Sequence, residues 1–249
     1  TTEDVEFNKY DAVLTGKKRN EISDLYLIEH KSLNNSEFYS LSSWSTDMVF
    51  YKDDELELFK SSSTQKVKLK DVALVFRGKS IRSNSNSGDI GVVNISNITE
   101  TEVDCTTIVK IEEDKLKVKR YELEDGDLLL TTRGTAIKTG VFKKQDILCI
   151  ASANLCVIRP SKRINTEYLK IFFSSTIGLK MLKSLQRGAS VMNINYKDVE
   201  ELEVPIPSIE RQNEIANEYK NKFAVYQEQL KNAHQCWENF WINFQKELY

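Results

Sequence analysis

Three short apolar runs in the middle of the chain are closely spaced and bounded by turn-forming residues. They cover Leu128–Thr132, Ile147–Ala151 and Leu155–Ile158, and Asp125 with Gly126 precedes the first. Short runs of β-forming residues between Gly, Asp and Asn indicate strands. Connections as short as these favour antiparallel pairing, because parallel neighbours need a long crossover. The pattern therefore predicts an antiparallel sheet whose strands follow one another closely.

Upstream of these runs the same pattern predicts further strands. Val72–Phe76 is apolar, and Gly91–Ile98 alternates apolar residues with Asn and Ser, as in a strand with one buried face. Two more strands are expected over Cys105–Ile111 and Leu116–Tyr121, which lead into the central runs. The fold class that follows is α+β, with a domain that is mostly antiparallel β.

After the sheet, the spacing of apolar residues changes to that of a helix. Asn165 or Thr166 is expected to cap its N-terminus, and the helix should run to Gly188 with a possible break at Gly178. Its apolar positions fall on one face, which we expect to pack on the sheet.

The last part of the chain carries the longest regular pattern. Val204–Pro207 is extended because of its prolines, and Ser208 is a good N-cap for a helix that would run to Tyr249 over roughly 60 Å. A domain of this size cannot bury such a length alone, so we expect coiled-coil or antiparallel pairing with a second helix; the alternative is a helix packed on its own domain. The apolar stripe steps alternately by four and three residues through Tyr219, Phe223, Tyr226, Leu230, Ala233, Trp237, Phe240 and Phe244.

The first 66 residues have the least regular pattern of the chain and support no functional prediction. A helix is expected over Glu21–Lys31, and a hairpin over Met48–Lys60 that turns at Asp53 and Asp54. A Ser-rich linker follows, so the chain is expected to divide into residues 1–66, 67–207 and 208–249.

Composition and charge narrow the class of protein only slightly. The chain has 249 residues, 40% of them hydrophobic and 29% charged, which is typical of a soluble globular protein. It contains neither an apolar run long enough to cross a bilayer nor a signal-peptide pattern at its start. The net charge is −2, yet residues 67–208 carry 22 Lys and Arg against 18 Asp and Glu. This excess is compatible with a polyanionic partner but does not demonstrate one.

Residues that could bind a metal or a cofactor are scattered. Cys105, Cys149, Cys156 and Cys236 lack metal-ligand spacing, and three of them lie in or beside apolar runs, so they are expected to be free thiols in a cytoplasmic protein. The two histidines, His30 and His234, are each isolated in sequence. We therefore expect no metal and no cofactor.

Taken in order, several segments of the chain form a recognisable set. They read VKLKDVALVFRGKSI, GDIGVVNISNI, LEDGDLLLTTRGTAIKTG, ASANLCVIRP, NTEYLKIFFSSTIG and RGASVMNINYKDVEELEVPIPSIERQNEI. This ordered set resembles the target-recognition domain of type I restriction-modification specificity subunits, over about residues 67–249. Residues 1–66 match no part of that family that we can place.

The resemblance implies a function and a set of partners. Such subunits recognise a specific double-stranded DNA sequence and direct adenine methylation and restriction without catalysis of their own. They hold methyltransferase subunits and, in the restriction complex, the restriction subunit. Full-length members contain two recognition units whose long helices pair antiparallel. The single unit here implies either a half-size subunit that forms a homodimer or a fragment.

If the domain binds duplex DNA, three polar loops are the candidates, because Arg and Asn can read base edges while Lys and Ser mostly hold phosphate. Each loop could instead be an ordinary solvated connection. Within the third, Val191, Met192 and Ile194 are expected to be core. The candidate residues are Arg77, Lys79, Ser80, Arg82, Asn84 and Asn86 in the first loop; Asn94 within the strand expected over Gly91–Ile98; Thr131, Thr132, Arg133, Thr135 and Lys138, with outward-facing hydroxyls and cations, in the second loop; and Arg187, Ser190, Asn193 and Asn195 in the third.

Two other functions remain open at this point. The chain could be the recognition part of a fused methyltransferase or nuclease, although it contains no Asp/Asn-Pro-Pro-Tyr/Phe signature and no Gly-rich phosphate-binding turn. It could also be a helix-pairing scaffold that binds protein and not DNA. In the scaffold, Trp237 would matter and Arg77, Arg133 and Arg187 would not.

Overall fold

The computed structural model describes residues 54–81, 87–99, 102–188 and 191–248. By its internal contacts the chain divides into residues 1–57 and 58–249, and the helix α4 (Asp54–Ser61) crosses the boundary between them. The helix expected over Glu21–Lys31 lies outside the described residues, as do Arg82, Asn84, Asn86 and Ser190.

The larger sheet has four strands in the order β2–β8–β5–β6, and every neighbouring pair is antiparallel. Residues 128–131 and 155–158 are buried, which explains why β5 and β8 read as continuous apolar runs in the sequence. Since β5 and β8 are antiparallel neighbours, the antiparallel pairing expected for these two central runs is confirmed. The strands are β2 (Ala73–Arg77), β5 (Leu128–Thr131), β6 (Thr139–Val141) and β8 (Leu155–Pro160).

A second sheet, in the order β4–β3–β7, corrects one sequence-based expectation. The run at β7 was expected to pair with its sequence neighbours, but β7 instead pairs in parallel with β3. The prediction was wrong because the long intervening segment supplies the crossover that a parallel pair requires. The core joins the two sheets, with Val93 and Cys149 packed in one cluster with Leu129 and Val157. The strands are β3 (Ile90–Val93), β4 (Val109–Ile111) and β7 (Leu148–Ala151).

Three other segments differ from the sequence-based expectation. Leu116–Tyr121 is not a strand: α5 (Lys115–Val118) starts there because Asp114 accepts a hydrogen bond from the Leu116 amide, and the 3-10 turn η4 (Lys119–Tyr121) follows. The strand expected to continue to Ile98 ends at β3 and is followed by the 3-10 turn η3 (Ile95–Asn97). The described part of the expected N-terminal hairpin is the helix α4.

Two short helices replace the single helix expected after the sheet. They are α6 (Thr166–Ser174), whose N-cap is Asn165, the first of the two expected candidates, and α7 (Thr176–Ser184), capped by Ser175. The break therefore falls at Ser175 and not at Gly178. Gly178 is buried where α7 approaches the end of α6, and a Cβ there would lie 2.0 Å from the Phe172 carbonyl oxygen. The glycine thus permits close helix packing and does not interrupt the helix.

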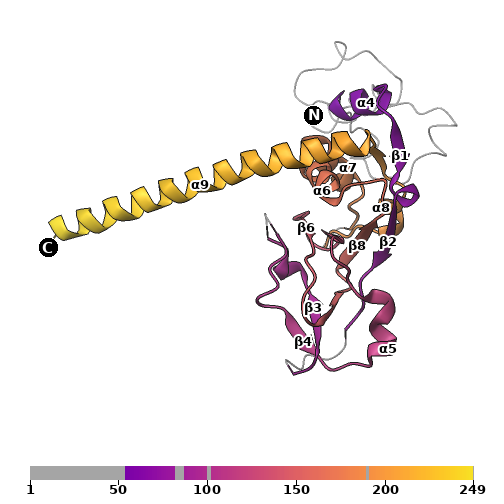
Figure 1. Cartoon of the computed structure of the whole chain (residues 1–249), viewed down its shortest axis with the longest axis horizontal. Helices are drawn as coiled ribbons and strands as arrows, with labels where there is room; N and C mark the ends of the chain where they lie inside the picture. Colours follow the sequence, from indigo (N-terminus) through magenta and orange to yellow (C-terminus); the bar gives the residue numbers. More distant parts are fainter. Residues whose placement is uncertain (1–53, 82–86, 100–101, 189–190, 249) are drawn as a thin grey trace, which may run out of the picture. The chain divides into compact units, whose positions relative to one another are not determined.

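The long C-terminal helix begins as the sequence predicted. It is α9 (Ile209–Glu247), and the Ser208 hydroxyl accepts a hydrogen bond from the Arg211 amide at 3.3 Å. The N-terminal part of α9 packs on α6, and Figure 1 shows the two helices side by side there. Preceding it are β1 (Lys66–Lys68) paired with β9 (Glu203–Pro205), the 3-10 turn η2 (Leu69–Asp71) and α8 (Tyr196–Glu200).

Gln212 and Ala216 are buried at the start of α9, whereas the described side chains after Ala216 are exposed, apart from a half-buried Phe223. The expected apolar stripe lies on this exposed part, with Tyr226 55%, Trp237 62% and Phe240 52% exposed. None of the helices in the described part of the chain combines the length and the apolar character needed to span a bilayer.

Candidate nucleic-acid interface

The candidate loops meet at one end of the four-stranded sheet. Arg77, the last residue of β2, is opposite Cys156, and Thr131, the last residue of β5, is opposite Leu155. Because β2 and β5 both run antiparallel to β8, their C-terminal ends lie at the start of β8. The loops that follow β2 and β5 therefore leave the sheet on the same side as the β7–β8 turn (residues 152–154). We call this end of the sheet the loop edge.

The first candidate loop is fixed beside the β7–β8 turn by one side-chain and one backbone hydrogen bond. Arg77 Nε donates to the Ala153 carbonyl at 2.8 Å, and the Lys79 amide donates to the Ala151 carbonyl at 2.8 Å. A Cβ on the intervening Gly78 would lie 2.2 Å from the Ser152 carbonyl oxygen, so this close approach requires glycine.

The cations and hydroxyl of this loop differ in their availability to a ligand. Arg77 and Ser80 are exposed. The Lys79 side chain is 19% exposed, and its Nζ lies 3.1 Å from Glu113 Oε2. Asn94 follows β3 beside the same turn, where the Ser152 amide donates to the Val93 carbonyl. Asn94 is half-buried, and its backbone amide donates to Asn97 Oδ1 at 2.9 Å, which gives Asn94 a local structural role.

The second loop corrects the expectation that its hydroxyls face outward. Thr131 and Thr132 are 2% and 5% exposed, because Thr131 pairs with Leu155 of β8 and the Thr132 amide donates to the Asn154 carbonyl of the β7–β8 turn. Thr131 Oγ1 donates to the Ala136 carbonyl at 3.0 Å and accepts from the Lys138 amide at 2.9 Å. Thr132 Oγ1 donates to the Asn154 carbonyl at 2.9 Å. These two hydroxyls shape the loop.

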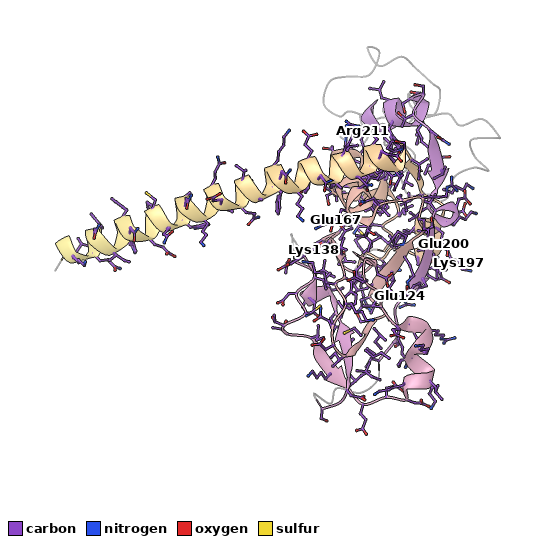
Figure 2. All side chains as sticks on the ribbon, in the orientation of Figure 1. Glu124, Lys138, Glu167, Lys197, Glu200 and Arg211 are labelled. Carbon is purple, nitrogen blue, oxygen red and sulfur yellow. The ribbon has the colours of Figure 1, made fainter. Side chains whose placement is uncertain are left out.

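The outer positions of the second loop are the ones that a ligand can reach. Arg133 and Thr135 are exposed, and Lys138 is half-buried. Figure 2 shows Lys138 at the side of the domain, well apart from Lys197 of α8. The contact surface of this loop therefore consists of Arg133, Thr135 and Lys138.

The third loop is joined to the second by backbone hydrogen bonds. The Gly134 amide donates to the Met192 carbonyl at 2.9 Å, and the Ile194 amide donates to the Thr132 carbonyl at 2.8 Å. Gln186 Nε2 also donates to the Gly134 carbonyl at 3.1 Å. The two loops thus form one continuous surface at the loop edge.

Within the third loop, one of the three expected core residues is buried. Ile194 is 3% exposed, as predicted, but Val191 and Met192 are 48% and 36% exposed, so those two predictions were wrong. The reason is a tight reversal: Gly188 has φ +128, and Arg187 and Asn193 exchange both backbone hydrogen bonds across it. Val191 and Met192 lie between these two paired residues and are exposed there.

The polar side chains of the third loop divide between contact and scaffold. Asn193 is exposed. Arg187 is also exposed, and its guanidinium lies 3.3 Å from Asp198 Oδ2. Asn195 is exposed but caps α8, since its Oδ1 accepts from the Lys197 amide at 3.1 Å. Asn193 and Arg187 are therefore better placed than Asn195 to contact a ligand.

The structure also reveals a groove that the sequence did not indicate. Its volume is about 600 Å³, and it adjoins the loop edge through Arg77, Ser80 and Ala153. The opposite wall comes from η4 and α8 and is lined by Arg120, Tyr121 and Tyr196. Four segments distant in sequence build this groove. Two of its lining residues, Arg120 and Tyr121, lie in Leu116–Tyr121, the segment that was expected to be a strand.

Buried titratable groups in the domain have structural roles. Burial raises the pKa of Cys149 to about 11 and also raises that of Cys156, which keeps both thiols protonated and inert. Asp127 is 1% exposed and accepts two hydrogen bonds from Arg159, at 2.9 and 2.8 Å. In the described residues, no three His, Cys, Asp or Glu side chains gather as a metal-binding group.

Comparisons with known proteins agree with this fold. The model of the type I restriction modification DNA specificity domain matches residues 62–229. The chain is 28% identical over 148 residues to the type I restriction enzyme EcoBI specificity subunit of Escherichia coli, covering 58% of this chain and 31% of that protein. It is 27% identical over 164 residues to the EcoKI specificity subunit of Escherichia coli strain K12, covering 61% and 35%.

The chain thus spans about a third of the length of these two relatives. Among solved structures, a chain from a study of complex assembly and conformational transition in the type I R-M system is similar with a TM-score of 0.52 and 18% identity. That similarity covers 72% of this chain and 46% of the other. Since the family model matches more than half of the residues of this chain, the chain belongs to the type I restriction modification DNA specificity domain family.

Proposed function

We propose that this chain is the DNA-recognition component of a type I restriction-modification system and that it reads a specific double-stranded sequence at the loop edge. The observation that carries this proposal is the meeting of all three candidate loops at one end of the β2–β8–β5–β6 sheet. Base readout requires several side chains held in fixed register against one duplex. Backbone hydrogen bonds between the second and third loops, together with the hydrogen bonds that hold the first loop beside the β7–β8 turn, would supply that rigidity.

The exposed side chains at the loop edge have the chemistry for this task. Arg133 and Arg187 carry planar guanidinium groups, which pair bidentately with guanine in the major groove. Asn193 can pair in the same way with adenine. Arg77, Ser80 and Thr135 are suited to phosphate or base contacts at the margins of this surface. The buried Thr131 and Thr132 would act only by holding the loop.

The partners follow from the same proposal. The chain itself would carry no catalysis and no cofactor. It would hold methyltransferase subunits on the duplex and, in the restriction complex, the restriction subunit. Extruding a target adenine from the stack requires DNA that is held in place, which recognition on both sides of the base provides. The exposed apolar stripe on α9 would pair with a second copy of the chain or with a second recognition unit.

A selection experiment tests the proposal. The chain is mixed with its methyltransferase subunits and a random duplex library, and the bound DNA is sequenced. We expect one enriched motif. We also expect Arg133→Ala to cost about 1–3 kcal/mol at one base position, while Lys143→Ala, an exposed lysine on the turn after β6, changes nothing. Failure to enrich any motif would refute the proposal.

A further inference from the structure

The groove beside the loop edge has a wall whose charge and orientation are fixed before any ligand binds. Arg120 lies with its guanidinium carbon 4.7 Å from the centre of the Tyr121 ring, and its NH2 donates to the Tyr121 hydroxyl at 2.7 Å. Stacking and hydrogen bonding together hold the planar guanidinium group of Arg120 in one orientation. A guanidinium held in this way loses less conformational freedom on binding an anion than a free side chain does.

Two of the three aromatic residues that line the groove, Tyr121 and Phe76, each have a guanidinium group over the ring, and the third, Tyr196, is half-buried. The Tyr121 ring is covered on one face by Arg120, and the Phe76 ring is covered by Arg159, whose guanidinium carbon is 5.4 Å from the ring centre. The polar side chains that line the groove are cationic or hydroxylic: Arg77, Ser80, Arg120, Tyr121 and Tyr196. Neither Asp nor Glu occurs among the described residues that line it. This chemistry favours a phosphate over a nucleobase.

The position of the groove places it where the DNA backbone beside the recognised bases would lie. Arg77 and Ser80 belong both to the first loop and to the groove, so the groove continues the loop edge without a gap in the lining. A duplex whose bases are read at the loop edge would carry its sugar–phosphate backbone along that continuation. A volume of about 600 Å³ is sufficient for a stretch of backbone.

We propose that this groove holds the sugar–phosphate backbone of the DNA beside the bases that are read, with Arg120 contacting a phosphate and Tyr121 positioning Arg120. This inference rests on the proposed DNA-recognition function and adds a sequence-independent contact to it. The contact sets the affinity of the chain and its register on the duplex, and it leaves base preference to the loop edge.

The test measures the affinity of the full chain, with its methyltransferase subunits, for a duplex carrying the selected motif at several salt concentrations. Each phosphate contact contributes about 0.9 to the slope of log K against log salt. We expect Arg120→Ala to reduce this slope by about 0.9 and to weaken binding ~3- to 10-fold equally on cognate and single-mismatch duplexes. Tyr121→Phe keeps the ring and removes the hydroxyl, and we expect a smaller loss of the same kind.

Controls separate this proposal from the one on which it rests. Lys143→Ala removes an exposed cation at the other end of the sheet and should leave the slope unchanged. Since Arg120 is exposed, its substitution should also leave the urea unfolding midpoint unchanged. If a motif is selected but Arg120→Ala keeps the wild-type slope, or weakens binding at one base position only, the groove proposal is overturned while sequence recognition stands. If no motif is selected, the proposed function itself fails.

Discussion

Gln212 is the side chain that fixes α9 to the recognition domain, and its replacement gives the sharpest test of that attachment. It is 0% exposed. Its Oε1 accepts from the Asn165 amide at 2.8 Å, and its Nε2 donates to the Arg163 and Pro207 carbonyls at 3.1 and 2.9 Å. One amide side chain thereby satisfies three backbone groups, at the start of α6 and in the segment before α9.

Gln212→Leu keeps the side chain about as large and removes all three hydrogen bonds. An unsatisfied buried donor or acceptor costs about 1–3 kcal/mol, and the added apolar burial offsets part of that. We expect the free energy of unfolding to fall by about 2–4 kcal/mol. The next residue provides a matched control: Asn213 is exposed, and its Oδ1 accepts from Asn165 Nδ2 at 2.7 Å. Asn213→Ala should cost less than about 1 kcal/mol.

Urea unfolding followed by circular dichroism measures both variants, with the change in midpoint and an unchanged m-value reporting stability. A Gln212→Leu variant as stable as Asn213→Ala would show that the buried amide does not hold α9, and the attachment described here would be wrong. Amide hydrogen exchange in α6 and the first turns of α9 should rise in Gln212→Leu, because these are the segments that lose partners.

Three further substitutions test other parts of the account. Gly78→Ala would place a Cβ 2.2 Å from the Ser152 carbonyl oxygen, so we expect a loss of about 2 kcal/mol or more in urea unfolding; an unchanged midpoint would contradict the close approach. Asp127→Asn leaves the Arg159 guanidinium, 24% exposed, without its buried carboxylate, and should cost about 2–4 kcal/mol; wild-type stability would show that the pair is dispensable. Trp237→Ala removes a side chain that is 62% exposed on the α9 stripe, and it should weaken helix pairing by about 2–4 kcal/mol in analytical ultracentrifugation; an unaltered dissociation constant would argue against pairing through this stripe.

Elements with local signals could be predicted from the sequence. The N-caps Asn165 and Ser208 each accept from a backbone amide of their own first turn, so residues within three positions specify them. The strands β5 and β8 are likewise buried on both faces and bounded by turn residues, which makes their apolar runs visible. The α9 stripe was visible because its period is regular over many residues.

Features decided by distant parts of the chain were not predictable. The parallel pairing of β7 with β3 depends on how two sheets share a core, and no local pattern encodes it. Thr131 and Thr132 resemble loop residues by composition, yet they are buried, Thr131 by pairing with β8 and Thr132 by its hydrogen bonds to Asn154. The Arg120 groove is assembled from four separate segments, so no single stretch of the sequence indicated it.

The central claim is that base choice resides in the sheet domain whereas the separation of half-sites resides in α9. Inserting one heptad into the exposed part of α9 keeps the apolar stripe in register and adds about 10 Å to the helix. That length corresponds to about three base pairs of duplex. Sequencing of methylated adenines in cells that carry the altered chain should show the same half-site bases with a spacer longer by about three base pairs. Altered half-site bases, or an unchanged spacer, would contradict the claim.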